Sequence, residues 1–425
     1  MASKGSAKAS LWNADTVYEL GLCRMLEQTL GIWPIGYQDT FSKVRLFVVA
    51  VLEISMIINL IREIIADCVI KDEMVNVVAL VACLIVGLLK IMILQINRSK
   101  MELVIKSAVD DWSMIEESSS REIMRQHART GRFVFIYQMA SAVLTIVPMA
   151  WATLPFLAEL PKSLKDRSEN LNARSYQNHS DFSLDHYEPK DKNLPQIFPM
   201  GTGCFIHDVS PIFYAFIYIT QIIQFMASCA GNVGTDVYFF STCMHVCGQF
   251  ELLNMKFENF GQDSDFRTSH EQIRVFVKRH NHLMKLSNNV EDSFNVLTLA
   301  QLSANAFIMS LLGVQLIIGI KTGNGASAIL ALSSIYVLSL QLFLYSYTGD
   351  YLTSQIEKIC YAIYCSHWYN LSPPFVKDLM FIMCRSNRSF NLTAGKVVSM
   401  NLDNFKNIFK AMGSYFSVLK LMFDE

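Results

Sequence analysis

Long stretches without any charged residue constrain this chain more than any other feature of its sequence. Four segments of more than 24 residues contain no Asp, Glu, Lys or Arg, and they lie between Arg132 and Glu159, Asp208 and Asp236, Asp292 and Lys321, and Lys321 and Asp350. About 20 apolar residues in a helix cross the roughly 30 Å hydrocarbon core of a bilayer. Each segment therefore predicts a transmembrane helix, whereas a buried helix of a soluble core would be shorter and amphipathic.

Two further apolar runs are interrupted near their middle by an ionisable residue. Glu53 interrupts the run from Phe41 to Ile65, and Lys90 interrupts the run from Met74 to Asn97. An ionisable group at bilayer depth costs about 3 kcal/mol, which pairing with an opposite charge partly offsets. If the two helices run antiparallel, Glu53 and Lys90 reach similar depths. They would then form either a gating or ion-path pair or a packing pair, and the sequence favours the packing pair.

The last 24 residues, Leu402 to Glu425, predict a seventh helix of a different kind. Asp403, Lys406, Lys410 and Lys420 interrupt its apolar residues, so it would insert poorly on its own. Such a helix is stable where other helices or water shield it from lipid, as around a pore. The alternative is a peripheral amphipathic helix at the membrane surface.

The distribution of Lys and Arg predicts the orientation. Basic residues concentrate before the first span, between Arg98 and Arg132, between Phe240 and Asp292, and after the sixth span, whereas only Lys321 separates the fifth and sixth spans. The positive-inside rule then places the N-terminus in the cytoplasm and, after seven spans, the C-terminus outside. This topology is the inverse of that of G-protein-coupled receptors.

Composition and motifs exclude several function classes. The net charge of −1 gives no basic excess for nucleic acid, and Met1 to Leu11 lacks the apolar core of a signal peptide. We find no phosphate loop, nucleophile motif, metal quartet or catalytic grouping around His245, His280 or His282, so we expect neither an enzyme nor a cofactor. A transporter is also disfavoured, because the chain does not divide into two matched halves.

Two covalent modifications are possible on the expected outer face, a disulfide and a glycosylation, and the sequence does not decide whether either forms. Cys68 and Cys204 are the cysteines expected near that face, where they could form a disulfide. Asn178 is the sequon that the topology exposes to glycosylation.

We expect an all-α membrane protein with a helical anchor layer in the cytoplasm, divided as follows. The segments are a cytoplasmic N-terminal segment (1–41), transmembrane helices 1 to 4 with an extracellular loop at 156–205 (42–240), cytoplasmic helical extensions (241–290), transmembrane helices 5 and 6 (291–348), anchor helices (349–400) and a pore-lining helix (401–425). Ser241 to Leu286 has an amphipathic pattern on both sides of the polar break Gly261 to Ser269, and Tyr351 to Met383 is expected to be helical except at Pro373-Pro374.

The chain resembles the insect odorant receptors, most clearly near its C-terminus. The shared features, in order, are Trp368, the helix Pro374 to Met383, Arg385-Ser386, Leu392-Thr393-Ala394-Gly395, Phe405, and Ser414-Tyr415-Phe416 with Leu419. Weaker matches are Asp236, His245 and Gln249 after the fourth span, and His280, Glu291 and Phe294 before the fifth. Leu421 stands where the family's co-receptor has Gln, so the chain resembles a ligand-tuned subunit.

This resemblance implies an odorant-gated, non-selective cation channel in the plasma membrane of olfactory sensory neurons, in their dendrites. The tuned subunit would bind a small volatile organic ligand and join the co-receptor in a heterotetramer within the lipid, in preference to forming a homotetramer. Trp368, Pro374 to Met383 and Ser241 to Leu286 are expected to bury the contact between subunits. The alternative is a seven-span chemoreceptor, gustatory-like or acting through a cytoplasmic partner, that does not conduct.

The outer halves of the second to sixth spans provide the candidate ligand site. They carry Val78, Val81, Thr145, Met149, Trp151, Ile212, Tyr214, Phe216, Leu312, Gln315, Ser333 and Tyr336. An apolar, aromatic lining with a few hydroxyls suits a small volatile molecule. The alternative for any one of these residues is ordinary packing between helices.

One face of the last helix provides the candidate gate. Tyr415, Val418 and Leu421 or Met422 recur every three to four residues, and by resemblance Val418 falls at the hydrophobic constriction. Asp424 and Glu425 would make the outer mouth net negative and attract cations. The alternative is that this face packs against the fifth span.

Overall fold

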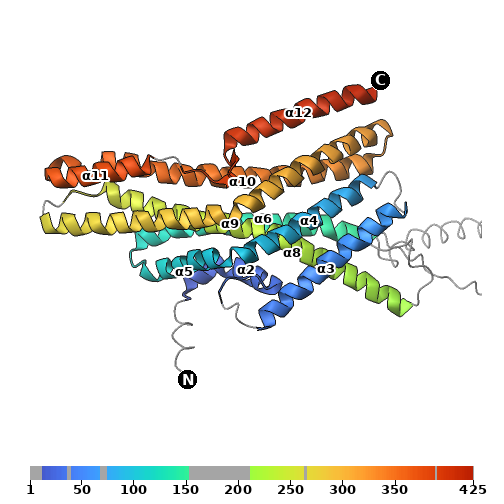
Figure 1. The fold of residues 1–425 in the computed structure, drawn as a ribbon, viewed down its shortest axis with the longest axis horizontal. Helices are drawn as coiled ribbons and strands as arrows, with labels where there is room; N and C mark the ends of the chain where they lie inside the picture. Colours follow the sequence, from blue (N-terminus) through green and yellow to red (C-terminus); the bar gives the residue numbers. More distant parts are fainter. Residues whose placement is uncertain are drawn as a thin grey trace, which may run out of the picture.

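The protein is a bundle of long helices with one short hairpin (Figure 1). The computed structural model describes residues 12–35, 40–67, 74–152, 211–262, 266–387 and 390–424. The described elements are α2 (Ala14–Leu30), α3 (Thr40–Ile65), α4 (Met74–Ile96), α5 (Arg98–Met114), α6 (Ser118–Ala152), α8 (Pro211–Glu258), α9 (Phe266–Lys321), α10 (Gly325–Cys365), the 3-10 turn η2 (Trp368–Asn370), α11 (Pro373–Ser386), β1 (Thr393–Ala394), β2 (Val398–Ser399) and α12 (Leu402–Asp424). The expected outer loop 156–205, with Asn178 and Cys204, and the residue Cys68 lie outside the described residues.

Five of the described helices are long and apolar enough to cross a membrane, namely α3, α4, α8, α9 and α10. Together with α6 and α12 they make the seven-helix arrangement that the four charge-free segments, the two interrupted runs and the last helix predict. At 48, 56 and 41 residues, α8, α9 and α10 exceed the roughly 20 residues that a bilayer requires. Each of these three helices therefore continues beyond the membrane at one end.

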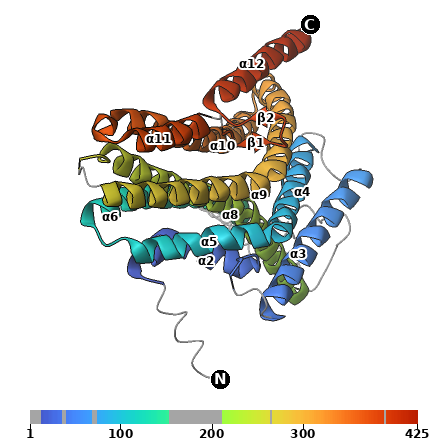
Figure 2. The same cartoon turned by 60° about the vertical axis from the view of Figure 1, so that its left-hand side comes forward.

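These continuations form, together with α2, α5, α11 and the start of α6, a compact layer at one end of the bundle (Figures 1 and 2). We call it the anchor layer, and it comprises residues 14–30, 98–131, 236–258, 266–294 and 345–386. Its core is rich in aromatic side chains; Phe250, Phe257 and Phe294 are almost fully buried, and the Phe257 and Phe276 rings meet edge to face at 4.8 Å. Burying one such side chain stabilises a fold by about 1.5–3 kcal/mol.

Two breaks in the helical pattern follow from backbone chemistry. Gly261, at φ +86°, ends the turn after α8 inside the predicted break, and a β-carbon there would lie 2.7 Å from the carbonyl oxygen of His367. The sequence placed the other break at Pro373-Pro374, but both prolines lie in the first turn of α11 and the chain is non-helical just before them. Proline is tolerated at this position because the first helical N–H groups have no intrahelical acceptor.

The hairpin between α11 and α12 is a tight turn, in agreement with the Leu-Thr-Ala-Gly pattern. Gly395 and Lys396 both have positive φ, 60° and 62°, and the Val397 N–H donates to the Ala394 carbonyl at 3.1 Å. This is the geometry of a type I′ turn. The positive φ of Gly395 favours glycine at this position.

Candidate functional site

A buried ion pair links the middle of the bundle. The Lys90 ammonium on α4 lies 2.6 Å from the Asp236 carboxylate on α8, and both side chains are at most 5% exposed. The Tyr345 hydroxyl on α10 donates to the same carboxylate at 2.5 Å, and the Gln341 amide donates to its other oxygen. Gln301 on α9 donates to Gln341 at 2.8 Å. Four transmembrane helices are therefore connected through one carboxylate.

This arrangement corrects the expectation that Lys90 pairs with Glu53. Lys90 instead contacts Asp236 and donates to the Asn232 carbonyl at 3.2 Å. Glu53 is 1% exposed and faces α8 beside Ser228. The expectation used only the depth of the two residues in the membrane. Lys90 lies on the side of α4 that faces α8, and its partner is therefore a residue of α8.

A second buried network lies inside the anchor layer and joins α2 to α5, α8 and α9. His245 on α8 contacts the Glu19 carboxylate of α2 at 2.9 Å through Nδ1 and the Asp111 carboxylate of α5 at 3.2 Å through Nε2. Trp112 donates its indole N–H to Glu19 at 2.5 Å, and Arg279 on α9 donates to Asp111 at 2.7 Å. With His245 protonated, two positive and two negative groups balance inside the layer.

The pKa values of this network agree with that assignment. Burial lowers the pKa of His245, but the Glu19 charge and the hydrogen bonds that the ring donates to both carboxylates outweigh burial and raise the pKa to about 9. Burial raises the pKa of Asp111, but His245 and Arg279 outweigh it and hold the pKa below its usual range. Paired carboxylates and imidazolium are thus the stable forms near neutral pH.

Glu27, two turns further along α2, has no such partner. It is 1% exposed, and neither carboxylate oxygen has a hydrogen bond among the described residues. The nearby Tyr238 hydroxyl on α8 is also buried without a partner in that part of the chain. Burial raises the pKa of Glu27 to about 8, so the side chain is largely neutral at pH 7.

The candidate ligand residues of α4 and α9 lie in the half of the bundle away from the anchor layer, which we call the outer half. Leu312 is buried against Ala79 of α4, and Val81 packs with the small cluster around Met56 of α3. Gln315 is 4% exposed and donates to the Ser327 hydroxyl at 3.2 Å, while its carbonyl oxygen is unpartnered in the described residues. Val78 is half-buried. This part of the predicted set includes one polar group that could accept a hydrogen bond from a ligand.

The remaining candidates are more exposed or lie beyond the described side chains. Ile212 and Phe216 on α8 are exposed, Tyr214 is half-buried beside Tyr218, and Ser333 on α10 is exposed. Tyr336 is 56% exposed, and its hydroxyl meets that of Tyr137 on α6 at 2.6 Å. Thr145, Met149 and Trp151 belong to α6, but their side chains lie outside the description.

The last helix leaves the bundle after its first turns (Figure 1). Phe405 and Phe409 pack against the core, and Phe405 meets Phe343 of α10 edge to face at 5.7 Å. Ser414 and Ser417 are exposed, and nothing lies within 4 Å of a β-carbon built on Gly413. The candidate gate and mouth residues fall in the final part of this helix, where the structure does not describe the side chains of Tyr415, Val418, Leu421, Met422 and Asp424, nor Glu425.

The hairpin ties the start of this helix to α9. Gly395 donates its N–H to the Asn295 carbonyl at 2.8 Å, Thr393 donates to Glu291 at 2.6 Å, and Lys396 pairs with Glu291. The Gly349 backbone on α10 lies so close to Met400 that no side chain would fit there. The base of α12 is thus fixed to both neighbouring helices.

Sequence reasoning did not identify the network around Glu19, Asp111 and Arg279. One signal was available in α2, where Asp15, Glu19 and Glu27 recur at multiples of four residues and therefore share a helix face. Acidic residues on the face that also carries Leu20 and Cys23 indicate buried polar partners.

Comparison with known proteins identifies the family of this fold. The family model described as 7tm Odorant receptor matches residues 71–413. Odorant receptor 63a of Drosophila melanogaster is 24% identical over 216 residues, 49% of this chain and 50% of that receptor. Odorant receptor 10 of Aedes albopictus is 22% identical over 218 residues, 50% of this chain and 56% of that receptor. The matched region thus spans about half the length of these curated relatives.

Solved structures agree over a longer stretch. The insect olfactory receptor OR5 from Machilis hrabei has a TM-score of 0.69 at 13% identity, covering 94% of this chain and 97% of that one. Its complex with eugenol has the same TM-score and covers 96% and 100%. Because the family model extends over most of the sequence and the fold matches almost throughout, the chain belongs to the insect odorant receptor family.

Proposed function

We propose that this chain is the ligand-tuned subunit of an odorant-gated, non-selective cation channel. It would assemble with the odorant co-receptor as a heterotetramer in the plasma membrane of olfactory sensory neurons, at their dendrites, with the N-terminus and the anchor layer in the cytoplasm. The orientation rests on the distribution of Lys and Arg.

The observation that carries this proposal is the shape of α12. A helix with charges at Asp403, Lys406 and Lys410 is a poor lipid-facing span, yet among its described side chains those that pack on its own subunit lie in the first turns, and Ser414 and Ser417 are exposed. Its free part therefore needs further protein or water around it. Copies of α12 around a central axis satisfy both needs, since one face would contact neighbouring helices and the other would line a wet pore.

The candidate ligand site is proposed in the outer half of each subunit. The eugenol complex of Machilis OR5 supports a small organic ligand for this fold. Leu312 and Val81 would supply apolar contact, and the unpartnered Gln315 oxygen would accept one hydrogen bond. Dispersion together with a single polar contact is the balance that suits a volatile molecule.

Excised patches test the function most directly. The chain is expressed with the co-receptor, and outside-out patches, which lack cytosolic messengers, receive odorant mixtures by rapid exchange. We expect a cation current within milliseconds that co-receptor alone does not give for the same mixture. A response present in intact cells and absent from patches would instead support a receptor that signals through a cytoplasmic partner.

Val418→Ser tests the proposed gate. A hydroxyl at an apolar constriction favours its hydration, so the variant should carry current without odorant. Ser417→Val, at an exposed neighbouring position, is the matched control and should stay closed at rest. Silent basal current in Val418→Ser, with normal surface expression, would place the gate elsewhere.

A further inference from the structure

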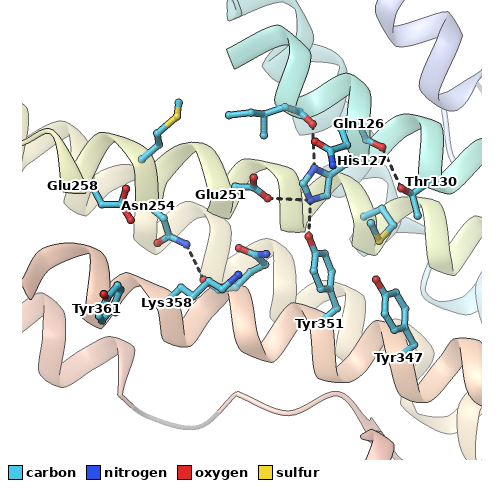
Figure 3. Close-up of a pocket in the computed structure, with 14 residues that line it drawn as sticks. Gln126, His127, Thr130, Glu251, Asn254, Glu258, Tyr347, Tyr351, Lys358 and Tyr361 are labelled. Atoms are coloured by element: carbon cyan, nitrogen blue, oxygen red, sulfur yellow. Dashed lines mark hydrogen bonds and ion pairs between the residues drawn. The ribbon is translucent and has the colours of Figure 1, made fainter. Parts of the chain in front are cut away.

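A cavity of about 670 Å³ opens between α6, α8 and α10 inside the anchor layer (Figure 3). It lies among the charged ends of these helices, away from the candidate odorant residues. Side chains of α8, including Glu251 and Asn254, face Tyr347 and Tyr351 of α10 across this space, and His127 of α6 lies between the two sides. Pockets for small molecules commonly measure about 300–1,000 Å³, so the cavity is large enough for one.

Two buried amides of this cavity each present an unused hydrogen-bond acceptor. The Asn254 and Gln355 side chains are 6% and 1% exposed, and the carbonyl oxygens of both amides lack a partner among the described residues. The Asn254 side chain is hydrogen-bonded through its nitrogen instead, which donates to the Gln355 backbone carbonyl at 3.1 Å. Buried acceptors without donors are costly, at about 1–3 kcal/mol each, unless a guest supplies the donor. The cavity therefore favours a molecule rich in N–H groups.

The charge of the lining favours a cation. Two carboxylates, Glu251 and Glu258, line the cavity, while Lys358 is its only Lys or Arg, so the lining is net negative when His127 is neutral. The His127 ring already contacts the Tyr351 hydroxyl at 3.1 Å and lies 3.4 Å from Glu251. The Glu251 side chain is 39% exposed, so it remains accessible to a second donor.

Stacked aromatic rings complete the lining. Tyr347 and Tyr351 stack with centroids 5.7 Å apart and ring planes within 6°, and the His127 ring lies 6.0 Å from Tyr351. Aromatic faces attract cations, by about 0.5–2 kcal/mol per contact. They also accept a flat organic group by stacking.

We propose that this cavity binds an organic cation, namely a guanidinium or primary ammonium that carries an aryl group. The N–H groups would donate to Glu251 and to the free oxygens of Asn254 and Gln355, and the ring would lie against Tyr347 and Tyr351. The site is separate from the odorant site and does not depend on channel activity. An occupant would bridge α6, α8 and α10 and so would act on the anchor layer.

Direct binding to the purified full-length chain tests this site. The probe is radiolabelled benzylguanidinium, and its uncharged analogue benzylurea has nearly the same shape. We expect saturable binding of benzylguanidinium and at least tenfold weaker binding of benzylurea. Glu251→Gln should weaken the binding of benzylguanidinium at least tenfold, because the variant keeps the size of the side chain and removes the charge.

Glu271→Gln is the matched control. The Glu271 carboxylate lies in the anchor layer too, but it is exposed and pairs with Arg274 at 3.5 Å. This variant should bind the probe as the wild type does. If Glu251→Gln does not elute as a folded protein, Glu258→Gln at the exposed rim provides the same measurement. The proposal fails if the wild type shows no saturable binding, if benzylurea binds equally well, or if a folded carboxylate variant keeps full affinity.

Discussion

The two halves of this bundle differ sharply in how they are packed, and α8 runs through both. Every residue from 234 to 250, in the anchor layer and next to it, is buried, whereas none from 212 to 220, in the outer half, is buried. The main core cluster gathers around the anchor layer, while the outer half has small clusters of three buried residues, around Leu84 and around Ala79. The two paired networks follow the same division, since the ion pair of Lys90 with Asp236 lies at the edge of the anchor layer and the His245 network lies inside it.

This difference separates rigidity from adaptability. Interlocking aromatic and ionic contacts allow few alternative arrangements, so the anchor layer can hold the base of α12 in place. Loosely packed helices can part around a ligand at low cost. The buried ion pair Lys90–Asp236 lies at the boundary, where a change in the outer half would meet the fixed inner half.

Removing one partner of that boundary pair should have the largest effect. Lys90→Met leaves the Asp236 carboxylate buried with only Tyr345 and Gln341 as donors. Breaking a buried pair in this way costs about 3–5 kcal/mol. We expect little protein at the cell surface and a clearly lower unfolding temperature for the purified chain.

Lys100→Met provides the comparison for this measurement. Lys100 pairs with Asp292 at 3.5 Å, but both side chains are about two-fifths exposed, 39% and 44%. Exposed pairs contribute about 0–1 kcal/mol. The double change Lys90→Met with Asp236→Leu should recover part of the loss. Equal unfolding temperatures of Lys90→Met and Lys100→Met would contradict a large contribution of the buried Lys90–Asp236 pair to stability.

The second prediction concerns Glu27, which weakens the anchor layer as pH rises. Burial raises the pKa of Glu27 from its ordinary 4.5 to about 8, so the folded state keeps a proton that the unfolded chain releases. The contribution of Glu27 to the free energy of unfolding is therefore fully present below pH 4.5 and is lost as pH rises through about 8. Glu27→Gln should raise the free energy of unfolding by about 3 kcal/mol at pH 7 and flatten its pH dependence.

Thermal unfolding between pH 6 and pH 9 measures this effect. The pKa of His245, raised to about 9, also makes the wild type less stable with rising pH, in the window from 6.5 to about 9. A residual slope in the upper part of the range is thus expected in Glu27→Gln and should disappear when His245→Gln is added. A wild type whose stability rises from pH 6 to pH 8 would contradict both assignments.

The third prediction places the contact between subunits on the exposed face of the anchor layer. Phe381 is 76% exposed on α11, whereas Leu379 on the same helix is 2% exposed and packs inside its own subunit. Both residues belong to the segment from which the sequence predicts the subunit contact, but Phe381 alone is free to make one. Phe381→Glu should abolish recovery of the tetramer with the co-receptor and leave the subunit folded, since burying one Phe contributes about 1.5–3 kcal/mol.

Affinity purification through the tagged co-receptor followed by size exclusion measures this outcome. Lys377→Glu, also an exposed position of α11, is the control and should leave the tetramer intact. Leu379→Glu should instead reduce the amount of folded subunit. Recovery of normal tetramer with Phe381→Glu would move the contact to another surface.

The sequence predicts the architecture well because the rules that apply to it are local. Absence of charge over more than 24 residues defines spans, and apolar spacing defines the helices on both sides of Gly261. The pairing of Lys90 with Asp236 was not predictable in the same way. Depth restricts the partners of a buried lysine, but the rotation of α4 about its axis decides among them, and that depends on packing with α8.

The anchor network was out of reach for a related reason. His245 lies 226 residues from Glu19 and 134 from Asp111, so no spacing rule connects these side chains. The sequence showed His245 without a carboxylate at a suitable spacing nearby, and folding brings two carboxylates to it. The candidate ligand residues remain a prediction, because α6 places Met149 among side chains that the structure does not describe.

The fourth prediction addresses the looser outer half. Met149→Ala, Phe216→Ala and Tyr336→Phe, made one at a time, should each shift agonist potency by up to about tenfold, which corresponds to about 1.4 kcal/mol. Tyr336→Phe also removes the hydrogen bond to Tyr137. Phe47→Ala, an exposed position of α3 outside the predicted set, should leave the dose–response curve unchanged. Unchanged curves in all three variants would refute the proposed ligand site.

The smallest effect is expected at the outer mouth of the proposed pore. Asp424 and Glu425 outnumber Lys420 at the end of the chain, so they should raise the local concentration of cations. Neutralising both should lower single-channel conductance, and more at about 0.01 M salt, where charges act over roughly 30 Å, than at 0.15 M, where they act over about 8 Å. Asp403→Asn with Lys406→Gln removes an exposed pair at the opposite end of α12 and should not change this salt dependence. A conductance loss of equal size at both salt concentrations would indicate a structural change of the helix rather than the loss of an attracting charge.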